Sequence, residues 1–245
     1  MRRLKFTPRL WPTLATLAVI PLLVALGHWQ LMRAEEKQRG HAEYMQRLAE
    51  PAVALDGSDP KMREFLRMQH RRMVAIGRYD AGTHFLLDNQ VHDGEAGYLV
   101  YTPFLLEGQQ AYLLIDRGWV PGGPDRRVPP VIETPTGVMS LSGVVALPPS
   151  PGIKLGENVP ENIAPNLVRL QRIEMDQMMQ KYAGKLLPYE LRLDPGVVGG
   201  FTRAWNEPGS GRERNLGYAF QWFAMAAVVA FLYLYLNLHR DDGLK

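Results

Sequence analysis

The chain has 245 residues, a formal net charge of +3 and no cysteine. A chain of this length forms one or two domains, and the absence of cysteine excludes disulfides, thiol catalysis and cysteine-based zinc or iron–sulfur sites. The basic residues are spread along the chain and interleaved with acidic ones, so no basic stripe indicates nucleic-acid binding. The six histidines lack metal-ligand spacing such as HxxxH.

The N-terminal region predicts a membrane anchor. Residues 1–9 carry four basic side chains, and residues 10–31 carry no formal charge. Crossing a bilayer takes roughly 20 apolar residues, so we expect a transmembrane helix at 10–31 with residues 1–9 in the cytoplasm. A cleaved signal peptide is the alternative, but the apolar run is longer than a usual signal core. Nine residues leave no room for a mitochondrial transit peptide, so we expect a bacterial inner membrane protein.

The long middle segment, residues 32–213, predicts a β-rich periplasmic domain. Its short apolar and β-branched runs are separated by Gly, Asp and Asn, which is typical of an antiparallel meander. Ten of the nineteen prolines fall between Pro121 and Pro165, so we expect an irregular excursion there. Short helices are predicted at 61–70 and 168–182. The expected strands are 73–77, 84–88, 98–106, 111–115, 138–145 and 186–193.

The C-terminal region predicts a second span. Residues 215–238 contain no charged side chain, so we expect a transmembrane helix at 216–238 and a cytoplasmic tail at 239–245. The predicted fold class is therefore α+β: a membrane-anchored protein whose two terminal transmembrane helices flank a β-rich antiparallel domain.

Each predicted span carries a glutamine beside a tryptophan. Burying an unsatisfied amide in hydrocarbon costs several kcal/mol, and two interpretations follow. In one, the tryptophans sit at the membrane interface and the glutamines bond each other or interfacial water. In the other, Trp29, Gln30, Tyr218, Gln221 and Trp222 line a site for a flat amphipathic ligand or for another membrane helix.

Catalytic motifs are not apparent. The sequence has no G-x-S-x-G elbow, no P-loop and no G-x-G-x-x-G fingerprint. The only candidates for general acid–base chemistry are carboxylates near predicted turns and strand ends: Asp88, Asp93, Glu95 and Asp116. We therefore expect a protein that is not an enzyme.

Six motifs in order resemble the Surfeit-locus (Shy-type) family of cytochrome c oxidase assembly factors, and the likeness runs nearly end to end. The motifs are 26–33 with Glu36-Lys37, Gly77-Arg78-Tyr79-Asp80, Asp88-Asn89-Gln90, Gly97-Tyr98 with Thr102-Pro103, residues 116–121 and residues 217–223.

The resemblance implies a non-enzymatic chaperone for haem-copper cytochrome c oxidase. Such a protein would assist haem a insertion into subunit I, or the stabilisation of subunit I, with subunit I, other assembly factors and membrane lipid as partners. Two other classes remain as alternatives: a membrane-anchored periplasmic ligand-binding or scaffold protein unrelated to respiration, and a membrane-bound hydrolase.

The resemblance also bears on haem. Many members have a histidine, the favoured haem ligand of bacterial members, where this chain has Asn215, and an amide is a poor axial ligand. His28 on the first span is the alternative ligand. Arg117 would pair with a haem propionate or, alternatively, pin the sheet locally. The resemblance thus implies at most transient contact with haem a.

Overall fold

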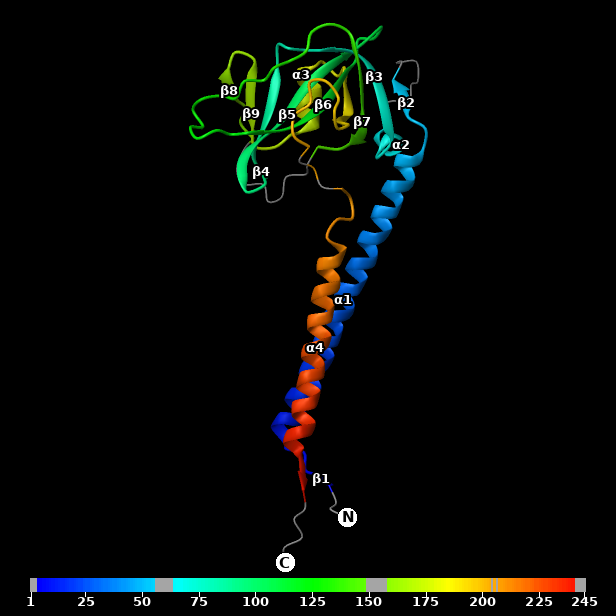
Figure 1. The fold of residues 1–245 in the computed structure, drawn as a ribbon, viewed down its shortest axis with the longest axis vertical. Coiled ribbons are helices and arrows are strands. Elements are labelled where there is room, and N and C mark those ends of the chain that lie inside the picture. Colours follow the sequence, from blue (N-terminus) through cyan, green and yellow to red (C-terminus); the bar gives the residue numbers. More distant parts are fainter. Residues whose placement is uncertain (1–3, 56–63, 149–157, 204, 206, 241–245) are drawn as a thin grey trace, which may run out of the picture. The chain divides into compact units, whose positions relative to one another are not determined.

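The computed structural model describes residues 4–55, 64–148, 158–203, 205 and 207–240. The chain divides into two compact units, a helical unit of residues 1–43 and 207–245 and a β unit of residues 44–206. Figure 1 shows the elements of both units. We describe each unit by itself.

The helical unit is built from two long helices, α1 (Leu10–Ala49) and α4 (Arg212–Asn237), with the last turns of α1 belonging to the β unit. Both helices are long and apolar enough to cross a membrane. A short antiparallel strand pair, β1 (Leu4–Phe6) with β11 (Leu238–Arg240), joins the start of α1 to the end of α4. The two helices lie side by side (Figure 1).

The β unit is a single curved sheet. Its strand order is β2-β3-β7-β10-β6-β5-β4-β9-β8, and β5 also pairs with β3. That extra pairing closes β3, β7, β10, β6 and β5 into a ring. The strands are β2 (Val53–Leu55), β3 (Arg72–Tyr79), β4 (His84–His92), β5 (Glu95–Leu106), β6 (Tyr112–Pro121), β7 (Met139–Ala146), β8 (Glu161–Ala164), β9 (Leu167–Leu170) and β10 (Leu186–Leu193), and the short helices are α2 (Phe65–Met68) and α3 (Met175–Lys181).

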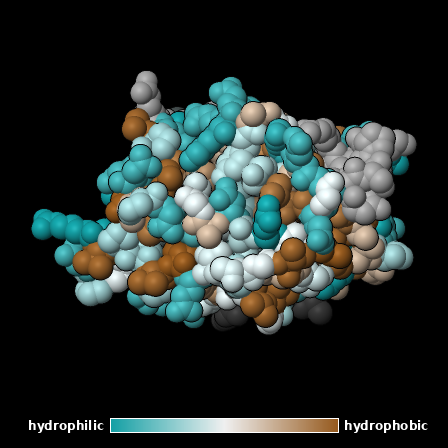
Figure 2. Space-filling model, turned by 90° about the horizontal axis from the view of Figure 1, so that it is seen from above, coloured by the Kyte–Doolittle hydropathy of each residue, from teal (hydrophilic) through white to brown (hydrophobic). Residues whose placement is uncertain are grey.

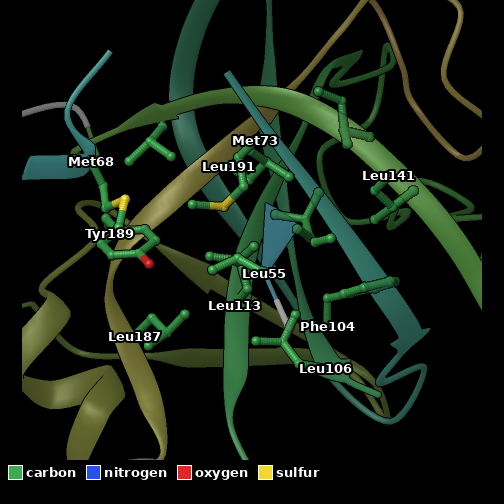
Figure 3. Close-up of a cluster of buried hydrophobic side chains, with 14 of the residues drawn as sticks. Leu55, Met68, Met73, Phe104, Leu106, Leu113, Leu141, Leu187, Tyr189 and Leu191 are labelled. Atoms are coloured by element: carbon green, nitrogen blue, oxygen red, sulfur yellow. The ribbon is translucent and has the colours of Figure 1, made fainter. Parts of the chain in front are cut away.

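The interior of the ring is the largest apolar cluster. Strands of period two send alternate side chains inward, and β3 shows this with Met73 and Ala75 fully buried. Figure 3 shows how side chains from all five ring strands converge, together with Leu55 of β2 and Met68 of α2. The labelled members are Leu55, Met68, Met73, Phe104, Leu106, Leu113, Leu141, Leu187, Tyr189 and Leu191.

Two smaller apolar clusters cover the sheet outside the ring. One lies beneath α3, where Met178 packs with Phe85, Leu99 and Leu170. The other gathers Leu86, Tyr98, Val100, Val120 and Leu167 with partly buried residues of β8 and of two irregular segments. Because these clusters cover the outside of the sheet, the side chains of β4, β5 and β6 are mostly buried on both faces. The face of the molecule seen in Figure 2 has hydrophilic and hydrophobic side chains interspersed.

The structure confirms the predicted fold class and the six predicted strands, five of them with different ends and Leu186–Leu193 as predicted. The antiparallel meander is confirmed for β4, β5 and β6, which pair in chain order, but it does not extend to the whole sheet, because β2–β3, β4–β9 and β6–β10 pair in parallel. The predicted helix at 168–182 is also wrong at its start, because Val168–Leu170 belongs to β9 and only Met175–Lys181 is helical. The short helix predicted at 61–70 is limited to Phe65–Met68, and residues 61–63 lie outside the described range.

The proline-rich excursion differs in its two halves. Residues 122–138 have no regular secondary structure, as expected. Within the same predicted segment, Met139–Ala146 and Glu161–Ala164 form β7 and β8. The prolines fall outside these two strands, as expected because proline cannot donate to a ladder hydrogen bond.

Gly77 permits the β3–β5 pairing that closes the ring. A Cβ atom at this position would lie 2.1 Å from the backbone oxygen of Leu105 and 2.8 Å from the ring of Phe104. We expect Gly77→Ala to lower the free energy of unfolding by about 3 kcal/mol, because the overpacked strand pair must separate. Thermal and denaturant unfolding of the detergent-solubilised chain measures this.

Gly82→Ala is the matched control. The nearest atom to its added Cβ is the carboxylate oxygen of Asp80 at 3.2 Å, at the end of a side chain that can move. We expect a change within about 0.5 kcal/mol. Equal effects of the two substitutions would show that ring closure does not depend on Gly77.

Candidate functional site

The best-defined polar feature of the helical unit is a side-chain bridge centred on Asn215. Its Nδ2 atom donates to Oε1 of Gln30 at 2.7 Å, and its Oδ1 atom accepts from Nζ of Lys37 at 2.8 Å. Lys37 also donates to the backbone oxygen of Gly211 at 3.3 Å, where α4 begins. We call Gln30, Lys37 and Asn215 the interhelical bridge. It engages both polar atoms of the Asn215 amide and the amide oxygen of Gln30, and it links α1 to α4.

Further contacts fix the same two helices along their length. The hydroxyl groups of Thr13 and Tyr233 are 2.8 Å apart near the other end of the pair. Between these links, Gly27 lies against the ring of Phe223, since a Cβ on Gly27 would be 2.7 Å from Cε1 of that ring. A small residue at such a position lets helices approach closely. α1 and α4 therefore form a tightly packed antiparallel pair, which we call the hairpin although the β unit lies between them in the sequence.

The structure does not gather the predicted membrane residues into one site. Gln30 accepts from Asn215, and the described residues show no hydrogen bond between Gln30 and Gln221, which was one of the two partners expected for the glutamines beside interfacial water. Trp29 is 54% exposed and Tyr218 is 46% exposed. Gln221 is exposed and Trp222 half-buried, and neither has a hydrogen bond to another described residue. Only Gln30 takes part in the interhelical bridge.

Asn215 does not fit the role of a haem ligand. Haem iron is commonly held by an imidazole, a thiolate, a thioether or a phenolate, and the carboxamide of Asn215 has both of its polar atoms engaged by Gln30 and Lys37. His28 is exposed on α1. The position at which the resemblance implies a haem ligand is thus a structural link in this chain.

In the β unit, Arg117 is fully buried in β6 and ties two distant segments to the sheet. Its Nε atom donates to the backbone oxygen of Gly199 at 2.6 Å. Its Nη1 atom donates to Oγ1 of Thr134 at 3.0 Å, and its Nη2 atom donates to the backbone oxygen of Glu133. These partners favour the interpretation in which Arg117 pins the sheet, through carbonyl and hydroxyl oxygens instead of a salt bridge.

Two aromatic rings and a histidine complete the surroundings of Arg117. Its guanidinium carbon lies 5.0 Å from the ring centre of Tyr79 and 4.7 Å from that of Phe201, within the range of cation–π attraction. His84 is buried, and its Nδ1 and Nε2 atoms lie 2.9 Å from Thr102 and 3.3 Å from Thr134. Burial, and then the charge of Arg117, lowers the pKa of His84 to about 4.

The two residues after Arg117 shape the end of β6. Gly118 has φ of 107° and lies so close to Thr202 that a Cβ would be 2.4 Å from that residue's backbone oxygen. Trp119 donates its backbone N–H to the same oxygen at 2.6 Å and its indole N–H to the oxygen of Gln90 at 3.0 Å. Only glycine adopts such a φ readily, so a glycine is needed at position 118, where the backbone of β6 lies against that of Thr202.

The Asp88-Asn89-Gln90 motif has a similar structural role. Asp88 is buried and accepts hydrogen bonds from Arg126 and from Gln171. The guanidinium of Arg126 also lies 5.4 Å from the ring centre of Tyr98. These contacts join the irregular segment 122–138 to β4 and β5. The predicted carboxylates Asp88 and Asp116 are therefore each engaged in separate clusters and form no catalytic pair.

Asp116 and Glu190 form a buried acidic pair with one cation. Both carboxylates are fully buried, and Arg192 lies between them, with Nε 2.8 Å from Oε1 of Glu190 and 4.0 Å from Oδ2 of Asp116. Oδ2 of Asp116 and Oε2 of Glu190 have no hydrogen-bond partner among the described residues. The sequence does carry a signal for this pair, because two charged residues, Glu190 and Arg192, interrupt the otherwise apolar strand 186–193.

Burial makes this pair retain a proton. Burial, and then the charge of Asp116, raises the pKa of Glu190 to about 8, while Arg192 opposes the shift. Burial also raises the pKa of Asp116 to about 6, against the opposing effects of Arg192, the Gly118 backbone N–H and Arg203. One positive charge therefore faces two carboxyl groups, of which Glu190 is the more easily protonated.

The acidic pair predicts a falling stability between pH 7 and 8. The folded chain keeps a proton on Glu190 that the unfolded chain has released, because an unfolded glutamate titrates near 4.3. The free energy of unfolding should fall by up to about 1.4 kcal/mol per pH unit as the pH rises through this window. His84 makes only a small, opposing contribution there, because its pKa is about 4 in the folded chain and the unfolded histidine, which titrates near 6.5, is mostly deprotonated above pH 7. Denaturant unfolding at pH 7.0, 7.5 and 8.0 measures the slope.

Glu190→Gln should remove the slope while Glu107→Gln, in an exposed turn, should keep it. The first substitution replaces the proton-retaining group with a neutral isostere. A Glu190→Gln variant that keeps the native slope would show that another group retains the proton.

The interhelical bridge predicts coupling between its members. In a double-mutant cycle of Gln30→Leu and Asn215→Leu, we expect a coupling energy of about 1 kcal/mol, typical of an interhelical hydrogen bond. The measurement is SDS-induced unfolding of the full chain followed by tryptophan fluorescence. The matched cycle of Gln30→Leu with Gln221→Leu should be additive, because those two side chains share no hydrogen bond. Additivity in both cycles would contradict the bridge.

Comparison with known proteins places these features in a family. The model of the SURF1 family matches residues 17–227. A SURF1-like protein of Monosiga brevicollis is 23% identical, over 91% of this chain and 86% of its own. A SURF1-like protein of Caenorhabditis elegans is 26% identical, over 70% of this chain and 53% of its own. The cytochrome oxidase assembly protein SHY1 of Saccharomyces cerevisiae is 28% identical, over 39% of this chain and 24% of its own. Because the family model matches most of its length, the chain belongs to the SURF1 family.

Proposed function

We propose that this chain is an assembly factor for cytochrome c oxidase. The observation that carries the proposal is the family match over residues 17–227, since one relative bears the name cytochrome oxidase assembly protein. The architecture agrees with it: two helices able to cross a membrane anchor a β unit whose motif residues are used for packing and hydrogen bonding. Such a molecule acts by binding, and we propose that it is not an enzyme.

We propose further that the target is subunit I of the oxidase and that the chain stabilises it through contacts within the membrane, in concert with other assembly factors. The engaged side chain of Asn215 supports this version of the role over one in which the chain ligates haem at that position. Contact with haem a, if the assembly step requires it, would then be transient and made by other groups.

The proposed orientation places residues 1–9 and the tail after residue 238 in the cytoplasm of a bacterial cell, with the β unit in the periplasm. The support is the basic residues ahead of α1, because positive charge flanking a first span is retained in the cytoplasm. In this orientation the interhelical bridge lies toward the periplasmic side of the bilayer.

A deletion strain tests the proposed function. We expect membranes of the strain to lose assembled oxidase, seen as loss of the haem a absorbance and of oxidase activity, while extracted haem a shows that haem synthesis continues. The native gene should restore both signals. Normal oxidase in the deletion strain would refute the role in assembly, and hydrolytic turnover by the purified chain would favour the hydrolase alternative.

A comparison of native protein with Asn215→His tests the role of Asn215. Both are purified from cells that make haem a, and bound haem is measured by absorbance per mole of chain. We expect the native chain to carry far less than one haem, and the variant, with an imidazole at this position, to carry more. One haem per native chain would overturn the proposal that the chain acts without a haem ligand at Asn215.

A further inference from the structure

α4 has two opposite faces. At 3.6 residues per turn, successive residues are rotated by about 100°, so Ala219, Phe223 and Ala226 share one side. Ala219 and Ala226 are buried, and Phe223 packs against Gly27 of α1. This side is therefore the face that α4 turns toward α1.

The opposite side of α4 is a stripe in which residues recur at alternating spacings of four and three. Val228 is 57% exposed, Phe231 66% and Tyr235 69%, and a Cβ on Gly217 would meet nothing within 4 Å. Residues at this spacing form the contact seam between two paired helices. The stripe consists of Gly217, Gln221, Ala224, Val228, Phe231 and Tyr235.

Gln221 makes this stripe different from an ordinary lipid-facing surface. It is exposed, and the described part of the chain provides no hydrogen bond to its side chain. The predicted span is centred on residue 227, so Gln221 lies about 9 Å from the middle of the span. The hydrocarbon core extends about 15 Å from the bilayer centre. The amide therefore lies within the hydrocarbon region.

An amide in this region requires a hydrogen-bonding partner. Acyl chains offer no donor or acceptor, and an unpaired amide there costs several kcal/mol. Water is excluded from the region, and the structure pairs Gln30 with Asn215, Thr13 with Tyr233, and the Asn237 amide with the backbone oxygen of Tyr233. Since no described residue bonds the Gln221 side chain, its partner is to be sought in another molecule.

We propose that the stripe binds a second copy of this chain, with the two α4 helices packed in parallel and the two Gln221 amides hydrogen-bonded to each other. Two copies insert in the same direction, so a two-fold axis along the membrane normal places each residue opposite itself. A carboxamide both donates and accepts, so it is complementary to its own copy. Gly217 and Ala224, which flank it, allow the backbones to approach.

The apolar part of the stripe supports this register. A single polar residue in an otherwise apolar seam fixes which residues face each other. In this register Val228 meets Val228, and the aromatic pair Phe231 and Tyr235, whose rings are 6.2 Å apart, meets its copy at the far end of the helix. The proposal is independent of the role in oxidase assembly.

The absence of cysteine from the chain makes a direct experiment possible. Single substitutions Ala224→Cys, Val228→Cys and Phe231→Cys are made in the full chain, and native membranes are oxidised with copper phenanthroline. We expect a cross-linked product of twice the chain mass from all three. Met225→Cys is the matched control: Met225 is exposed and adjacent in depth, but lies about 80° from the centre of the stripe. It should give little product.

The amide is tested on the Phe231→Cys background. Gln221→Leu should reduce the cross-linked fraction about threefold, as for the loss of one interhelical hydrogen bond, and Gln221→Asn should retain more of it than Gln221→Leu. Immunoblotting of total chain confirms that each variant reaches the membrane. The gel shift also identifies the partner, since a second copy doubles the mass and another protein does not.

Three results would overturn the proposal. The first is equal cross-linking at Met225→Cys and Val228→Cys, which indicates random collision. The second is a Val228→Cys product with a mass other than twice that of the chain, which assigns the stripe to a different membrane protein. The third is an unchanged product from Gln221→Leu, which would leave the amide without a role in the contact.

Discussion

The helical unit is governed by the requirement that polar groups in a bilayer find partners inside protein. Gln30, inside the first predicted span, accepts from Asn215, which lies at the start of the second and accepts from Lys37, and Thr13 is paired with Tyr233. Each of these contacts joins α1 to α4, so satisfying the polar groups also determines how the helices pair. Gly27 then allows the close approach that these short bonds need. The same few contacts between α1 and α4 therefore determine both the packing and the hydrogen bonding of the two helices.

The same requirement shapes the β unit, where the low-dielectric medium is the protein interior. Among the described residues Arg117 has no carboxylate partner, and it is accommodated by carbonyl oxygens, a threonine and two aromatic rings. Glu133, Thr134 and Gly199, which accept from it, lie on segments without strands, so one side chain organises two irregular stretches. The family motifs in this unit thus specify a scaffold, and the surface that meets a partner must be sought elsewhere.

Sequence patterns predicted what depends on local periodicity. The charge-free runs identified both membrane helices, and short apolar and β-branched runs between turn residues identified the strands from 72 to 146 and 186 to 193. Strand order was not accessible in this way, because the parallel pairing of Leu167–Leu170 with β4 joins segments far apart in the chain. The apolar residues of β9 lie only a short segment, residues 171–174, ahead of α3, which explains why the two were merged into one predicted helix.

The candidate site was harder to predict than the fold. Side-chain partners in a helix pair depend on the relative rotation of the helices, and no pattern within one segment reports it. Two glutamines beside two tryptophans indicated a shared environment, yet Gln30 turned out to bond Asn215, a residue considered only as a replaced haem ligand. Lys37 was visible in the motif, but its reach across to α4 depends on an antiparallel alignment that only the structure supplies.

The short ribbon of β1 and β11 constrains the order in which the molecule is completed. It pairs Leu4 with Arg240 and Phe6 with Leu238, so it joins residues separated by almost the whole chain. On a ribosome the first of these strands exists long before the second, and it must wait while the intervening domain is translated and folds. Pairing of β1 with β11 therefore comes after synthesis of the whole β unit, and contacts of such large sequence separation form slowly.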